Sequence, residues 1–144
     1  MTGSLWVVCD ASGSMAESGK NLIMRGLVRA IEQYFRLGYA AKAQLRLVWW
    51  GDYAAPLDWH PNAEVPDALF ANQGSANGES LAQLLNGESH ARVLILTDGF
   101  WTDASRHAVK NLRMALGPNA LRVIRVGADA NPRGGTRPVG RFDG

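Results

Sequence analysis

The sequence predicts an α/β fold with a mostly parallel sheet and helices on both of its faces. Three observations predict it. Short, continuous apolar segments alternate with longer segments of helical periodicity. The apolar segments lack the polar alternation of strands that face water, as is typical of strands buried on both faces. The length of 144 residues and the hydrophobic content of 47% are those of one globular domain with a buried core.

The strands are predicted from short apolar runs. Leu5–Cys9 is a continuous run that ends at Asp10, and Arg92–Thr97 has the same character. Such runs favour parallel strands, because helices then cover both faces of the sheet. The full set of predicted strands, of which the third is a short edge strand, comprises residues 5–9, 45–50, 54–59, 92–97 and 121–126.

The first helix is predicted over Lys20–Leu37, where apolar residues recur every three or four positions before Gly38. We expect the inner face to hold Ile23, Met24, Leu27, Ile31, Tyr34 and Phe35, and the outer face to hold Arg25, Arg29, Glu32 and Arg36. The other predicted helical segments are a single turn at 67–70, a short helix at 79–85 and a longer helix that is capped by Thr102 or Asp103 and runs to Leu116.

We expect one domain over residues 1–127 and a tail or loop over residues 128–144, where Gly, Pro and Arg are frequent and periodicity is lost. The N-terminus lacks the basic segment and cleavage site of a signal peptide, and no apolar run reaches the roughly 18 residues of a membrane span. The single cysteine excludes a disulfide scaffold. These features predict a cytoplasmic protein without a membrane segment.

The net charge of +2 is distributed unevenly. Residues 50–91 contain six acidic residues and no Lys or Arg, whereas residues 18–49 and 92–144 each have a net charge of +5. The acidic stretch borders the predicted carboxyl edge of the sheet through its loops. It either concentrates cations there or is simply a solvated surface.

Polar side chains follow the strands at the edge where parallel α/β sheets bind ligands. Asp10, Ser12 and Ser14 follow the first strand, Asp98 follows the fourth, and Ser75 lies in a Gly-rich loop before a helix. Carboxylate and hydroxyl oxygens without imidazole or thiolate suit a hard divalent ion such as Mg²⁺, Mn²⁺ or Ca²⁺. Two carboxylates just neutralise the charge of the ion, and hydroxyls add coordination without adding charge. The ion therefore stays electrophilic, and we expect it to take a further anionic ligand from outside.

This arrangement resembles the metal-ion-dependent adhesion site (MIDAS) of von Willebrand factor A (VWA) domains. Asp10-x-Ser12-x-Ser14 and the Thr97-Asp98-Gly99 turn match the family pattern, and Gly74-Ser75 with Gly78 and Leu81 matches its Gly-Thr-x-x-Gly-x-x-Leu stretch with Ser in place of Thr. The resemblance covers roughly residues 4–127. It implies a Rossmann-like sheet and a metal site formed by Asp10, Ser12, Ser14, Ser75 and Asp98, with Mg²⁺ as the first expectation.

The resemblance also implies a function: a protein-interaction module whose cation captures an Asp or Glu of a partner protein. We expect the Gly/Pro/Arg-rich segment to stand in place of the last strand and closing helix of the family, and therefore expect no helix-sliding switch. The chain is most similar in style to small bacterial intracellular members. Those often work beside an AAA+ ATPase or within multi-gene systems, so an AAA+ ATPase or a co-encoded protein is the partner that the resemblance implies.

Two other functions are alternatives for this sequence. An enzyme that uses the metal for phosphoryl transfer or hydrolysis needs a positioned base, and the sequence offers none, so we expect no enzymatic activity. His60, His90 and His107 are scattered, and Cys9 lies in a predicted buried strand. A nucleic-acid binder would use the basic residues of the first helix or of the tail: Lys20, Arg25, Arg29, Arg36, Arg133, Arg137 and Arg141.

The aromatic residues suggest how a partner would be held. Phe100 and Trp101 directly follow the Thr97-Asp98-Gly99 turn, so they either stand at the rim of the site as anchors for a partner or pack beneath the turn. Trp6 and one of Trp49 and Trp50 are expected in the core, because adjacent strand residues face opposite sides of the sheet.

Overall fold

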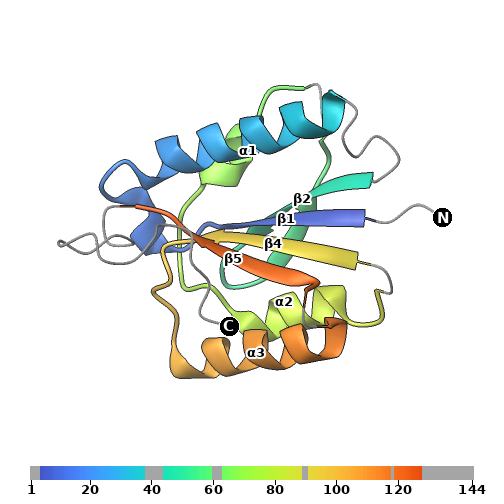
Figure 1. Cartoon of the computed structure of the whole chain (residues 1–144). Coiled ribbons are helices and arrows are strands. Elements are labelled where there is room, and N and C mark those ends of the chain that lie inside the picture. The colour runs from blue at the N-terminus through green and yellow to red at the C-terminus, as the bar shows by residue number, and fades with distance from the viewer. Residues whose placement is uncertain (1–3, 38–43, 60–62, 89–90, 118, 128–144) are drawn as a thin grey trace, which may run out of the picture.

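The computed structural model describes residues 4–37, 44–59, 63–88, 91–117 and 119–127. A five-stranded sheet lies between two helical layers, with α1 on one face and α2 and α3 on the other (Figure 1). In chain order the elements are β1 (Ser4–Asp10), the 3-10 turn η1 (Gly13–Ala16), α1 (Lys20–Arg36), β2 (Gln44–Trp50), β3 (Ala54–Leu57), the 3-10 turn η2 (Asp67–Phe70), α2 (Gly78–Leu85), β4 (Ala91–Thr97), α3 (Asp103–Leu116) and β5 (Leu121–Arg125).

The sheet has the order β3-β2-β1-β4-β5. All neighbouring pairs are parallel except β2 and β3, so the predicted edge strand is an antiparallel addition. The predicted α/β class, its mostly parallel sheet and its helices on both faces are confirmed, and each predicted element is present within a few residues. The predicted tail, residues 128–144, lies outside the described residues.

The core has two halves because alternate residues of each strand face opposite sides of the sheet. In β1, Val7 and Cys9 face α1, whereas Trp6 and Val8 face α2 and α3. Full burial of such apolar side chains contributes roughly 1.5–3 kcal/mol each. The continuous apolar run that predicted β1 is therefore explained by helices on both sides.

Two details of the core differ from the prediction. In α1, Ile23 and Tyr34 are exposed and Glu32 is buried, because the inner face centres on Met24 and Val28 and leaves the predicted stripe off-centre. In β2, the tryptophans at positions 49 and 50 are both buried, each with its indole N–H bonded to a carbonyl oxygen in the segment between β3 and α2.

The described helices include none that is both long and apolar enough to cross a membrane.

Candidate functional site

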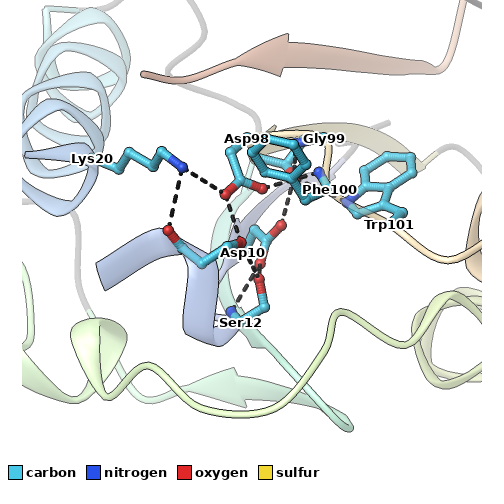
Figure 2. Close-up of polar contacts among 9 residues, drawn as sticks. Asp10, Ser12, Lys20, Asp98, Gly99, Phe100 and Trp101 are labelled. Atoms are coloured by element: carbon cyan, nitrogen blue, oxygen red, sulfur yellow. Dashed lines mark hydrogen bonds and ion pairs between the residues drawn. The ribbon is translucent and has the colours of Figure 1, made fainter. Parts of the chain in front are cut away.

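The candidate site lies at the carboxyl edge of the sheet, where β1 and β4 run side by side. β1 ends at Asp10 and β4 ends at Thr97, with Cys9 paired to Leu96 in the register. The two segments that follow these strands therefore leave the sheet next to each other. This parallel pairing brings Asp98 to the Asp10-x-Ser12-x-Ser14 segment, as the sequence predicts (Figure 2).

Asp10 is fully buried and accepts hydrogen bonds on both carboxylate oxygens. Ser12 donates twice to Oδ1, from its backbone N–H at 2.9 Å and from its hydroxyl at 2.6 Å. The Thr97 hydroxyl donates to Oδ2. Burial raises the pKa of Asp10, these hydrogen bonds oppose the rise, and the nearby Asp98 carboxylate adds to it. Asp10 is thus a desolvated carboxylate whose charged neighbour has the same sign.

Asp98 is also fully buried. The Ser14 hydroxyl donates to its Oδ2 at 2.6 Å, and the Phe100 backbone N–H donates to its Oδ1 at 3.1 Å. The hydroxyl oxygens of Ser12 and Ser14 are 3.4 Å apart. Carboxylate and hydroxyl oxygens therefore form a continuous path from Asp10 through the two serines to Asp98. We call Asp10, Ser12, Ser14 and Asp98 the oxygen cage.

Thr97 fixes the turn that presents Asp98. Its buried hydroxyl oxygen accepts hydrogen bonds from the Gly99 backbone N–H and the Trp101 indole N–H, both at 2.9 Å. Gly99 has a φ of +82°, and a Cβ there would lie 2.7 Å from the Arg125 side chain. Each residue of the Thr-Asp-Gly sequence thus has a role: the Thr97 hydroxyl holds the turn by hydrogen bonds, Asp98 presents a carboxylate, and Gly99 adopts a conformation that favours glycine.

Ser75 is placed differently from the other predicted metal ligands. It is exposed, and its backbone N–H donates to Asp52 Oδ1 at 3.0 Å. The Gly13 N–H donates to Gly74 O at 2.9 Å, which ties the Ser75 loop (residues 71–77) to the loop that follows β1. Among the hydrogen bonds of the described residues, none joins the Ser75 hydroxyl to the oxygen cage. Its role as a ligand stays a prediction.

Asp52 holds the Ser75 loop in place, a role that was not predicted from the sequence. Besides bonding to the Ser75 N–H, its carboxylate fills the space beside Gly74, where φ is +70° and a Cβ would lie 2.2 Å from Asp52 Oδ1. Asp52 follows β2 at the same edge where Asp10 ends β1. That shared position was the signal that would have identified it.

Lys20 is the second residue that the sequence analysis assigned differently. It begins α1, is 1% exposed, and directs its ammonium group into the site (Figure 2). Its Nζ lies 3.1 Å from Asp98 Oδ2 and 3.3 Å from Ser14 O. The prediction that Lys20 contributes to a basic surface is therefore wrong, because its ammonium group is buried and paired with the Asp98 carboxylate.

The rest of the predicted basic surface is only partly described. Arg25 lies 3.4 Å from Asp67 Oδ1 and stacks over the Phe70 ring, whereas Arg29 is exposed. The side chain of Arg36 and the three arginines of the tail lie outside the described residues. Nucleic-acid binding stays a disfavoured alternative, and the burial of Lys20 removes one of its candidate residues.

The two aromatic residues after the turn have different surroundings. Phe100 is 57% exposed, with the Lys20 ammonium 5.1 Å from its ring centroid. Trp101 packs edge-on against Trp50, with ring centroids 5.5 Å apart, and its indole N–H bonds to Thr97. More than half of the Phe100 side chain is thus accessible beside the turn, whereas the Trp101 indole supports the turn from beneath.

The nucleophile and base candidates are accounted for as follows. Cys9 is buried in β1, where burial raises the pKa of its thiol and keeps it neutral. His107 lies exposed on α3, and His60 and His90 lie outside the described residues. The described residues contain no cluster of three or more His, Cys, Asp or Glu that would hold a metal by themselves. An ion at this edge would therefore use the serine hydroxyls as well.

The oxygen cage fits a hard divalent ion. It combines two buried carboxylates with two hydroxyls, the ligand types that Mg²⁺ and Ca²⁺ prefer. Two like charges in a buried position are unfavourable, and Lys20 offsets one of them. A divalent ion would offset the other and would favour the ionised form of Asp10.

No protein-family model and no curated protein matches this sequence. Solved structures do: three of proximal thread matrix protein 1 (PTMP1) from the mussel byssus, one of them with a zinc-occupied MIDAS motif, are similar in fold. Their TM-scores are 0.52, 0.54 and 0.55 at 17–18% sequence identity. The match covers 86% of this chain and 35% of theirs, so this chain spans about a third of the length of those proteins. The likeness shows a VWA-like fold.

Proposed function

We propose that this domain binds a divalent cation in the oxygen cage and through it captures a carboxylate group of a partner protein. The observation that supports this most directly is the meeting of Asp10 and Asp98, both fully buried, each with a serine hydroxyl that donates to it at 2.6 Å, and with the two hydroxyl oxygens 3.4 Å apart. Two adjacent buried carboxylates are costly, and the Lys20 ammonium offsets only one of the two charges. A divalent ion in the oxygen cage would offset the other.

The residues that would hold the ion are those of the oxygen cage, with Ser75 as a further ligand if its loop approaches. Mg²⁺ is our first choice because the ligands are all oxygen, and Mn²⁺ and Ca²⁺ have the same preference. Bound there, the ion supplies a positive charge that an outside carboxylate can complete. The zinc-occupied MIDAS of PTMP1 supports a divalent ion in this fold, without identifying the ion here.

The protein side of the site orients the partner. Phe100 is exposed beside Asp98 and offers an apolar contact next to the position of the captured carboxylate. We propose a partner with an accessible Asp or Glu. From the resemblance to small bacterial VWA proteins, an AAA+ ATPase or a co-encoded protein is the first class to test. We propose binding without turnover at this site.

The test is a calorimetric titration of Mg²⁺ and Mn²⁺ into the wild type and Asp10→Asn. Asparagine keeps the shape of Asp10 and removes its charge, and the charged neighbour of Asp10 is another carboxylate, so the variant should fold. We expect ion affinity to fall at least about 100-fold, or about 2.7 kcal/mol. Asp58→Asn is the matched control, because it removes an exposed carboxylate that follows β3 and belongs to neither the oxygen cage nor the Ser75 loop.

Carboxylate capture is tested separately. Acetate is titrated into the Mn²⁺-saturated protein, with acetamide as the neutral control of the same shape. Binding heat with acetate and none with acetamide supports capture. The absence of binding heat with both ligands contradicts capture. Equal ion affinity in the wild type and Asp10→Asn would contradict the metal site. Turnover of a generic phosphoester by the loaded wild type, lost in Asp10→Asn, would instead show an enzyme.

A further inference from the structure

The side chain of Lys20 is buried, unlike those of most lysines, which are solvated. Lys20 is the first residue of α1, yet it is 1% exposed, and burying a lysine ammonium is costly unless the charge is paired. Its Nζ is paired with Asp98 Oδ2 at 3.1 Å and also approaches Ser14 O at 3.3 Å. Both contacts are with residues of the oxygen cage. Lys20 therefore belongs to the site as a charged group.

The side chain is held in place along its length. The Phe100 ring lies over the ammonium group, with 5.1 Å between Nζ and the ring centroid. At the stem, Gly127 passes so close that a Cβ there would lie 3.0 Å from Lys20 Cγ and Cε. Gly127 has a φ of +107°, which favours glycine on its own account. The packing leaves the ammonium directed at Asp98.

The charges of the three buried groups described above can be summed. Asp10, Asp98 and Lys20 together have one net negative charge, and all three are buried. A divalent cation would change this to one net positive charge, and a single carboxylate from outside would restore neutrality. Without Lys20, the loaded cage would already be neutral and would attract an anion less. Lys20 thus weakens ion binding and strengthens carboxylate capture, because like charges repel and unlike charges attract within one buried site.

We infer that Lys20 is a built-in counter-cation that competes with the divalent ion for Asp98 and makes the ion-loaded site selective for anions. This rests on the proposed function and specifies how the same site is regulated. In the absence of the ion, the ammonium keeps Asp98 paired. When the ion is present, the same ammonium leaves the site with one positive charge in excess of neutrality, which one carboxylate from outside can neutralise.

The test compares Lys20→Met with Arg29→Met. Methionine keeps an unbranched chain of similar length without the charge, and Arg29 is an exposed cation on the same helix. Lys20→Gln is the second variant, because its amide can still donate to Asp98. Mn²⁺ is titrated into each protein, and acetate is then titrated into each Mn²⁺-saturated protein. We expect both Lys20 variants to bind Mn²⁺ at least about tenfold more tightly and acetate at least about threefold more weakly than the wild type. Arg29→Met should match the wild type.

Each outcome decides the inference. Unchanged or weaker Mn²⁺ binding in both Lys20 variants overturns it, while Mn²⁺ binding by the wild type would leave the proposed function intact. If Lys20→Met binds Mn²⁺ and the wild type does not, the result supports the inference and contradicts the proposed function of the wild type. If neither binds, both fail. A Lys20→Met that melts without cation and refolds with Mn²⁺ supports the inference, and failure of both variants to fold with Mn²⁺ overturns it.

Discussion

The two halves of the carboxyl edge use the same residue types for different purposes. At the oxygen cage, Asp10 and Asp98 are fully buried and bond to hydroxyls and backbone N–H groups, and Asp98 also to an ammonium. At the Ser75 loop, Asp52 is exposed and bonds to the backbone N–H of Ser75. The position of a carboxylate after a strand therefore does not show whether it belongs to a binding site or holds a loop, and its burial is needed to decide. A buried carboxylate is unfavourable unless a cation or hydrogen-bond donors lie beside it, whereas an exposed carboxylate is solvated and can hold a loop in place.

The largest expected effect separates Asp98 from Asp52. Asp98→Asn removes the carboxylate that lies 3.1 Å from the buried Lys20 ammonium, so we expect a loss of about 3–5 kcal/mol in the free energy of unfolding without metal. Asp52→Asn should cost about 1 kcal/mol or less. Urea denaturation of both variants measures the difference. The double variant Asp98→Asn/Lys20→Met should regain part of the loss, and equal costs for Asp98→Asn and Asp52→Asn would remove the contrast between the two halves.

A smaller effect distinguishes the two aromatic residues after the turn. Trp101→Ala removes the contact with Trp50 and the hydrogen bond to Thr97, so we expect the free energy of unfolding to fall by about 2 kcal/mol. Phe100→Ala removes an exposed ring and should cost about 0.5 kcal/mol. Thermal unfolding of the two variants side by side tests this. A Phe100→Ala variant as unstable as Trp101→Ala would show that Phe100 supports the fold and is no free anchor.

The smallest effect tests the Ser75 loop. Gly74→Ala places a Cβ where the Asp52 carboxylate lies and at a φ of +70°, so we expect a loss of about 1 kcal/mol in stability. Asp52→Ala should remove the steric part of this loss and leave the conformational part. A double-mutant cycle by urea denaturation separates the two. Additive costs would mean that Asp52 does not position the loop in solution.

The chain order of strands, helices and polar loops followed from local patterns. The continuous apolar runs of β1 and β4 and the periodicity of α1 are properties of neighbouring residues, and the structure has all three elements. Asp10 and Asp98 could also be placed together, because parallel strands end at one edge of a sheet. The sequence alone therefore determined the fold class, the edge that holds the site and the two carboxylates at its centre.

Tertiary structure decided which charges are buried. The pattern of α1 allowed more than one inner face, and packing against β1 and β2 selected the face of Met24 and Val28. Nothing local shows that Lys20 points inward, since its partner Asp98 comes from a distant segment. The same holds for Asp52, whose partner is the Ser75 loop. The reason is physical: a charge tolerates burial only when the fold brings an opposite charge or a hydrogen bond to it.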